Sequence, residues 1–221
     1  MLDPAPDLAG RTVLLAGATS AAGTAVARAL AEAGALVLAV GRSQERLDAL
    51  AAAVPAADTR TCDLTNASEV AELAMRIHLK FGPIDGLVNL VGGWRGGGGI
   101  AGQSDDDWAF LEGSLTALRL TSRVFYDDLA ASEAGRLAIV SSTSVDTPTA
   151  GNASYAALKA AAETWTRAVG QGLAKADTAA AAVIFRVTSL AGLEERLATS
   201  VVDLWSQDAS ELNGRTVTLT A

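Results

Sequence analysis

Residues 137–159 of the chain read LAIVSSTSVDTPTAGNASYAALK, and the rest of the sequence can be interpreted from this stretch. It begins with the apolar run 137–140, which predicts a buried β-strand, and it ends in an alanine-rich segment that predicts a helix. Ser142 follows the strand, and Tyr155 and Lys159 lie near the start of the helix. A strand, a polar loop and a helix in succession indicate one unit of an α/β fold.

Tyr155 and Lys159 are four residues apart, so a helix places both side chains on one face. A nearby ammonium group favours the phenolate and lowers the pKa of a tyrosine from its ordinary value of about 10. The pair therefore predicts a tyrosine that exchanges a proton near neutral pH, with the Ser142 hydroxyl placed to polarise a substrate carbonyl. Because the motif is short, the alternative is an exposed tyrosine and lysine without a chemical role.

Strand and helix patterns alternate on both sides of this stretch. Strands are predicted at 12–16, 35–40, 59–62, 85–91, 136–141, 179–187 and 216–220. Helices are predicted at 22–33, 44–53, 66–80, 104–131, 153–174 and 193–206, the fourth with a break near Gly113. This alternation predicts an α/β fold: one doubly wound parallel sheet of about seven strands, with helices on both faces. No linker or repeat divides the chain, so we expect one domain over residues 1–221.

Composition narrows the class of protein. Of the 221 residues, 50% are hydrophobic and the mean hydropathy is +0.28, which fits a buried parallel sheet under alanine-rich helices. A net charge of −8 argues against a nucleic-acid or anionic-membrane partner. The single cysteine, Cys62, fits a reducing compartment, and the first ten residues do not read as a signal peptide, so we expect a cytoplasmic protein. His78, the only histidine, has no Cys or His cluster around it, so no metal site is predicted.

The first strand-to-helix turn, residues 16–23, is made of small residues that let a backbone approach a pyrophosphate, with a helix N-terminus behind it. The alternative is an ordinary tight turn. After the second strand the chain has Arg42 and Ser43 in place of a carboxylate, which favours a 2′-phosphate over a ribose hydroxyl. Asp63 follows the third strand, either as an acceptor for an adenine amine or as a local cap. Asn89, polar within the fourth strand, must be hydrogen-bonded.

The order of these motifs resembles the short-chain dehydrogenase/reductase family over nearly the whole chain. The matching pieces are residues 17–23, Gly41-Arg42, Asp63-Leu64, Asn89 to Gly92, Ser142, Tyr155 with Lys159, and Asn213-Gly214-Arg215. The resemblance implies a Rossmann fold, a nicotinamide cofactor and hydride transfer to or from a carbonyl-like group. It also implies that Tyr155 is the general acid/base, that Lys159 holds the nicotinamide ribose and lowers the tyrosine pKa, and that Ser142 orients the substrate oxygen. The implied cofactor-binding residues are Gly17, Thr19, Ser20, Ala21, Ala22, Gly23, Arg42, Ser43, Asp63, Leu64, Asn89, Leu90, Val91, Gly92, Val140, Tyr155, Lys159, Val187 and Thr188.

The chain departs from the family pattern at several places. Ala21 replaces a glycine of the turn, and Ser114 is aligned with an asparagine that joins a proton relay, so Ser114 is the candidate relay residue. The Pro-Gly pair that usually follows the sixth strand is missing, so the segment that covers the substrate is very short. The run from Gly92 to Gly99 contains Trp94 and looks like the dihydropteridine reductase branch, although Arg42 departs from that NADH-using branch. Trp94 is the candidate that stacks on a flat substrate ring; the alternative is a loop packed on the domain or on a partner.

These observations predict an oxidoreductase that uses NADP(H) in preference to NAD(H) and acts on a carbonyl- or imine-like small molecule. The alternative is a nucleotide-binding relative with lost turnover that serves as a regulator or assembly subunit. Alanines beside Tyr155, Trp165 and Val169 on the 153–174 helix predict close helix packing between subunits, and the family resemblance implies a homotetramer or a homodimer. The alternative is a monomer whose alanine-rich helices pack on its own sheet.

Overall fold

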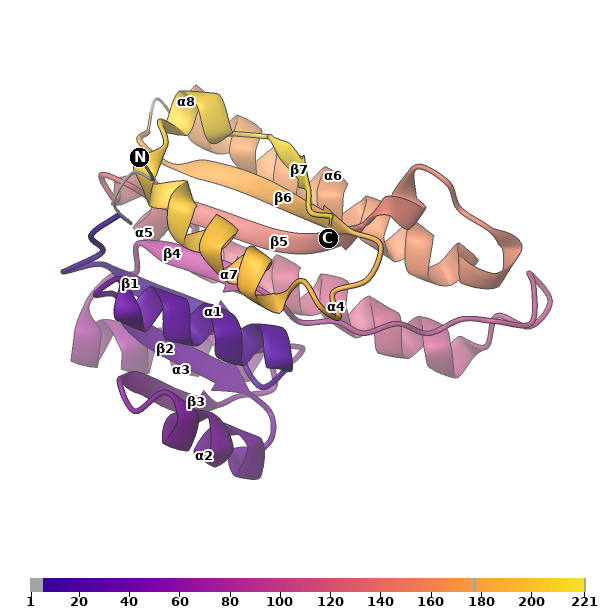
Figure 1. Ribbon diagram of the computed structural model, residues 1–221, viewed down its shortest axis with the longest axis horizontal. Coiled ribbons are helices and arrows are strands. Elements are labelled where there is room, and N and C mark those ends of the chain that lie inside the picture. Colours follow the sequence, from indigo (N-terminus) through magenta and orange to yellow (C-terminus); the bar gives the residue numbers. More distant parts are fainter. Residues whose placement is uncertain (1–5, 177, 221) are drawn as a thin grey trace.

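Seven parallel strands form the central sheet of the computed structural model, which describes residues 6–176 and 178–220 (Figure 1). The strands are β1 (Thr12–Ala16), β2 (Leu36–Gly41), β3 (Ala57–Thr61), β4 (Gly86–Asn89), β5 (Arg136–Ser142), β6 (Ala181–Val187) and β7 (Thr216–Thr218). Their order across the sheet is β3-β2-β1-β4-β5-β6-β7, which confirms the predicted doubly wound sheet. Residues 1–5, part of the segment that does not read as a signal peptide, lie outside the described residues, as do residues 177 and 221.

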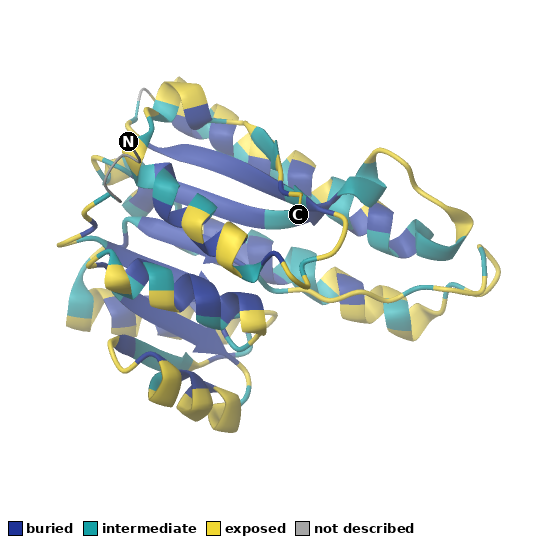
Figure 2. Cartoon of the chain, in the orientation of Figure 1, coloured by how far each residue is buried: buried dark blue, intermediate teal, exposed yellow. Residues whose placement is uncertain are grey.

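Helices cover both faces of the sheet. One core lies under α1 (Ala21–Glu32), α2 (Gln44–Ala53) and α7 (Glu194–Val202). The other lies under α3 (Ala67–Phe81), α4 (Asp105–Val124) and α6 (Ala153–Lys175). The inner strands β1, β2, β4, β5 and β6 are almost wholly buried, whereas the edge strands β3 and β7 are partly exposed and the outer faces of the helices are exposed, as Figure 2 shows. Residues buried on both faces of a parallel sheet give the near-continuous apolar runs seen in the sequence.

Strand order fixes where a ligand can bind. The chain moves outward from β1 to β3 and then crosses back, so β4 pairs with β1 on its other side. Neighbouring crossovers therefore leave β1 and β4 in opposite directions, which opens a crevice at the carboxyl ends of these two strands. The turn after β1 and the loop after β4 both begin at this point.

Some predicted boundaries are wrong. The break in the predicted 104–131 helix falls at Phe125, between α4 and α5 (Tyr126–Ala131), and Gly113 lies inside α4. A helical glycine costs only about 1 kcal/mol, which the packing of a long helix offsets. The predicted 85–91 strand ends at Asn89. The predicted 193–206 helix is α-helical to Val202 and then a 3₁₀ turn, η3 (Asp203–Ser206), and the short helix α8 (Ala209–Leu212) was missed.

Two loops extend beyond the carboxyl edge of the sheet (Figure 1). One is the glycine-rich loop 90–104 between β4 and α4. The other is the segment from η1 (Thr143–Val145) through η2 (Ala150–Asn152) to α6. The Gln103 side chain joins them, because its Nε2 donates to the carbonyls of Gly97 (2.9 Å) and Gly151 (3.3 Å) and its Oε1 accepts from Ser154 N (3.2 Å).

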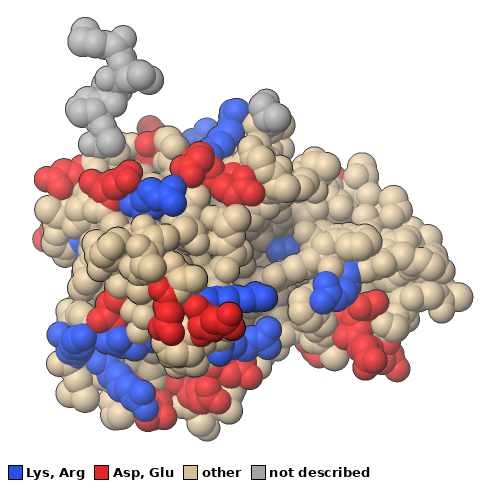
Figure 3. All heavy atoms as spheres, turned by 60° about the horizontal axis from the view of Figure 1, so that its bottom comes forward, with Lys and Arg blue, Asp and Glu red and all other residues tan. Residues whose placement is uncertain are grey.

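Within the described residues, no helix combines the length and the apolar character that crossing a membrane requires. On the face drawn in Figure 3, acidic and basic side chains are interspersed.

Candidate active site

A groove of about 510 Å³ lies along the carboxyl edge of the sheet. Cofactor pockets commonly fall in this range of volumes, so the groove has room for a dinucleotide. Nine of the predicted cofactor residues line it: Gly17, Thr19, Ser20, Arg42, Asp63, Leu64, Leu90, Val91 and Gly92. The relay candidate Ser114 lines it as well.

At the head of the groove, the backbone of Gly17 lies unusually close to the backbone of the loop that follows β4. Its φ of 79° favours glycine, and a Cβ at this position would lie 2.7 Å from the backbone nitrogen of Val91. One turn later, a Cβ on Gly23 would lie 2.1 Å from the carbonyl oxygen of Ala18. The turn therefore leaves no room for a side chain at Gly17 or Gly23, and the N-terminus of α1 meets the groove at Thr19 and Ser20. Such a cradle suits a pyrophosphate.

Three residues of this turn serve α1 itself. Ser20 is the N-cap, and its Oγ accepts from Gly23 N at 3.0 Å. Ala21 is the exposed first residue of the helix, and Ala22 is buried in the core beneath it. Ala22 and Gly23 therefore support the turn from behind, while Thr19 and Ser20 face the groove.

Arg42 and Asp63 lie at the other end of the groove. Arg42 is exposed, and its charge contributes to holding the pKa of Asp63 below its ordinary value, although hydrogen bonds from Thr65 contribute more. Asp63 Oδ1 accepts from Thr65 N (2.9 Å) and Thr65 Oγ1 (2.7 Å), so its second oxygen is the one available to a ligand. Ser43 Oγ accepts from Arg46 N and caps α2, and Ser43 does not line the groove.

Asn89 ends β4 and is buried. Its Oδ1 accepts from Val91 N at 2.9 Å, which confirms that this polar residue is hydrogen-bonded. Its Nδ2 has no partner among the described residues. The contact bends the chain out of the strand, so that Leu90, Val91 and Gly92 form the groove wall.

Tyr155, Lys159 and Ser142 come together beside this wall. Lys159 Nζ donates to the carbonyl of Val140 at 2.8 Å and lies 5.7 Å from the centre of the Tyr155 ring. Gly92, in the loop after β4, faces the Lys159 amine, since a Cβ at Gly92 would lie 3.6 Å from Lys159 Nζ. Ser142 is buried at the end of β5, and its Oγ accepts from Ser144 N at 3.1 Å. The Ser142 hydroxyl also hydrogen-bonds with the Tyr155 side chain.

The titration of this cluster differs from the prediction. Burial raises the pKa of Tyr155, and a hydrogen bond with the Ser142 hydroxyl offsets this only in part. Burial also lowers the pKa of Lys159 to about 8, against the opposing charge of Glu163. The prediction that the pKa of Tyr155 lies below its ordinary value is therefore wrong for this structure, because desolvation dominates. The phenol is protonated at neutral pH.

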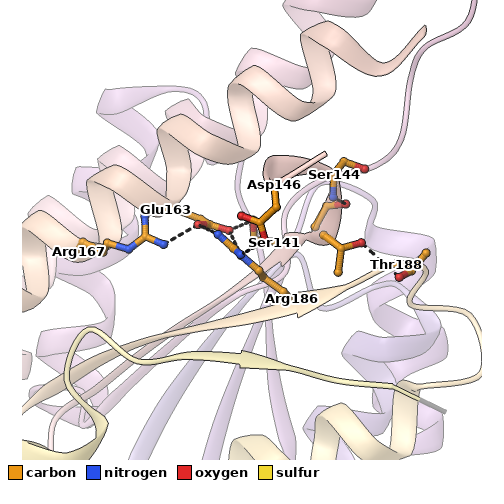
Figure 4. Close-up of polar contacts among 9 residues, drawn as sticks. Ser141, Ser144, Asp146, Glu163, Arg167, Arg186 and Thr188 are labelled. Atoms are coloured by element: carbon orange, nitrogen blue, oxygen red, sulfur yellow. Dashed lines mark hydrogen bonds and ion pairs between the residues drawn. The ribbon is translucent and has the colours of Figure 1, made fainter. Parts of the chain in front are cut away.

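The remaining predicted residues surround this cluster. Ser114 Oγ donates to Leu111 O in its own helix at 2.6 Å, and Lys159 binds Val140, so no direct relay contact joins Ser114 and Lys159 in the described residues. Val187 is buried at the end of β6. Next to it, the Thr188 hydroxyl lies 3.2 Å from the hydroxyl of Thr143 (Figure 4). Trp94 is 59% exposed on the glycine-rich loop and lies outside the groove.

Several groove residues were missed in the sequence. They are Arg46, Cys62, Thr65, Ala109, Phe110, Glu112, Gly113, Thr116 and Ala117. Those of α4 form one helical face, a signal visible only once the helix is known to flank the groove. Burial raises the pKa of the Cys62 thiol to about 11, so this thiol is unreactive at neutral pH. No group of three or more potential metal-ligating side chains occurs in residues 6–176 and 178–220.

The chain is similar in sequence to known short-chain dehydrogenases. A family model described as short chain dehydrogenase matches residues 11–198. The chain is 32% identical over 180 residues to 2,3-dihydro-2,3-dihydroxybenzoate dehydrogenase of Bacillus subtilis (strain 168), an alignment that covers 77% of this chain and 67% of that protein. The chain spans about two thirds of the length of the first curated relatives it matches.

Solved structures agree on the fold. A candidate short chain dehydrogenase from Pseudomonas syringae superposes with a TM-score of 0.88 at 24% identity, and the match covers 99% of both chains. A metagenomic short-chain oxidoreductase in complex with NADP superposes with a TM-score of 0.86 at 25% identity, covering 97% of this chain and 99% of that one.

Proposed function

The chain belongs to the short-chain dehydrogenase/reductase family of NAD(P)-dependent oxidoreductases, and from this premise we propose that it is an NADPH-dependent reductase of a carbonyl- or imine-like small molecule. The observation that carries the proposal is the meeting of Ser142, Tyr155 and Lys159 beside a groove that fits a dinucleotide. The groove extends from Arg42 past the β1 turn to Ser114.

The preference for NADPH rests on the open end of the groove. Arg42 is exposed there, with Arg46 also in the lining, and the residue after β2 carries no carboxylate. A guanidinium group binds a phosphate through charged hydrogen bonds, whereas a ribose hydroxyl calls for an acidic acceptor. The NADP complex of the metagenomic relative is consistent with this choice.

Proton transfer is assigned to Tyr155. A bound nicotinamide would supply the hydride. As charge develops on the substrate oxygen, the protonated phenol donates to it and the Ser142 hydroxyl stabilises it. Lys159 lies behind the phenol, where its ammonium group can hold the cofactor ribose. A raised tyrosine pKa suits the direction of reduction, because the acid must be protonated before the step.

The substrate approaches from the side of the two joined loops. The segment between β6 and α7 is short, so the glycine-rich loop and its Gln103 contacts provide most of the cover. We propose that Trp94, exposed on that loop, contacts a flat substrate ring once the site is filled. We further propose that the protein acts as a homodimer or homotetramer.

The test is a panel of ketones, quinones and flat heterocycles, followed by the loss of NADPH absorbance. Wild-type protein is expected to oxidise NADPH with at least one of them. Tyr155→Phe keeps the ring but removes the proton, so it should bind NADPH normally by calorimetry and lose about 10²–10⁴-fold in kcat. An undiminished kcat in this variant would contradict the assigned role.

A further inference from the structure

Glu163 is a completely buried carboxylate behind the candidate active site. Its Oε1 accepts from Ser141 Oγ and from Arg186 Nε, both at 2.7 Å. Its Oε2 accepts from Arg186 Nη2 and from Arg167 Nη2, also both at 2.7 Å. Figure 4 shows these groups converging from α6, β5 and β6. A buried ion is costly unless its partners satisfy it, and every oxygen here is satisfied.

The network touches both elements that carry the reacting groups. Tyr155, Lys159 and Glu163 follow one another at intervals of four residues, so they form a single row along α6. Ser141, which binds Glu163, immediately precedes Ser142 on β5. Arg186 Nη1 also donates to Asp146 Oδ2 at 2.6 Å, and Asp146 ends the η1 turn that follows Ser142.

We propose that Glu163 is a positioning residue of the reaction centre: it holds the Ser142 end of β5 against α6 and supplies the negative charge that keeps Lys159 in its ammonium form. The catalytic meaning of this role rests on the proposed function. The effect on Lys159 itself can be measured without any turnover.

The surrounding charges support the assignment. Lys159 faces the Val140 carbonyl from β5, the Tyr155 phenol from α6 and Gly92 from the β4 loop, none of which is anionic at neutral pH. Burial lowers the pKa of Lys159, and Glu163 is the charge that acts in the opposite direction. Without Glu163, Arg186 and Arg167 would keep Asp146 as the remaining anion of the network.

The test uses the small number of lysines in the chain. Lys80, Lys159 and Lys175 are the only three, so ¹³Cε-lysine labelling gives three NMR signals whose shifts report protonation directly. We expect Lys159 to titrate near pH 8 in the wild type, assigned by loss of its signal in Lys159→Met. In Glu163→Gln, which keeps the shape and removes the charge, the midpoint should fall by about one pH unit. Lys80 and Lys175 serve as internal controls.

Arg167→Gln is the matched control. Arg167 binds the same carboxylate, but its side chain is 45% exposed, and the substitution leaves the Glu163 charge in place. Removing a nearby cation should leave the Lys159 midpoint unchanged or raise it. Loss of charge and general loosening of the site are thereby separated, because only loss of charge lowers the midpoint in Glu163→Gln while leaving it unchanged or raised in Arg167→Gln.

An unchanged Lys159 midpoint in folded Glu163→Gln overturns the proposal, and so does a fall in both variants. Should Glu163→Gln fail to fold, the double variant with Arg167→Gln removes one charge of each sign, and its midpoint should still fall because the exposed arginine is screened. If the wild type reduces no substrate but the titrations behave as expected, the proposed function fails and this inference stands. If turnover is found and the midpoint does not move, only this inference fails.

Discussion

Lys159 makes the stability of the ligand-free protein depend on pH in a way that one substitution isolates. Burial lowers its pKa from 10.5 to about 8. Between pH 7 and pH 9 the unfolded chain keeps this proton while the folded protein releases it, so stability rises with pH across the window. The folded state holds on average about half a proton less over these two pH units, which at about 1.36 kcal/mol per unit gives a gain of ~1.4 kcal/mol.

Lys159→Met removes the titrating group, so we expect the variant to lack this gain. Urea unfolding, followed by tryptophan fluorescence at pH 7, 8 and 9, measures the difference between wild type and variant, and contributions from all other groups cancel in that difference. Lys175→Met is the control, because Lys175 is exposed near the end of the same helix, and it should keep the wild-type slope. Parallel wild-type and Lys159→Met curves would refute the reasoning.

Three further outcomes are expected. Arg42→Ala should weaken NADPH binding by about 1.5–3 kcal/mol and leave NADH binding unchanged, because only the phosphate loses charged hydrogen bonds; equal calorimetric losses for both cofactors would contradict this. Gly17→Ala should destabilise the fold by ~1–3 kcal/mol in urea, since its φ of 79° and the close Val91 nitrogen strain any Cβ, and an unchanged midpoint would show that the turn adapts. Ala168→Arg should split an oligomer, because Ala168 lines a hollow of about 370 Å³ with Trp165 and Val169 on the outer side of α6; light scattering that finds wild type as a 22.4 kDa monomer would rule this out.

The candidate site was only partly predictable. Motifs such as the β1 turn and Arg42 lie at strand ends, and a parallel sheet gathers its strand ends at one edge, so knowing the elements was enough to place them together. Glu163 was missed because nothing near it in the sequence distinguishes it from a solvated glutamate. Its partners Ser141 and Arg186 lie 22 and 23 residues away and meet it only because β5 pairs with β6 beneath α6.

The sequence by itself determined the order of the elements, the motifs at the strand ends and the family. These depend on residues within about one helical turn or one strand, where local periodicity and hydrogen bonding dominate. The tertiary structure alone decided the break at Phe125, the link made by Gln103 and the direction of the Tyr155 pKa. Each of these depends on burial and on contacts between distant segments. Desolvation in particular is a property of the packed interior, so the spacing of Tyr155 and Lys159 along a helix could not reveal that it dominates the pKa of Tyr155.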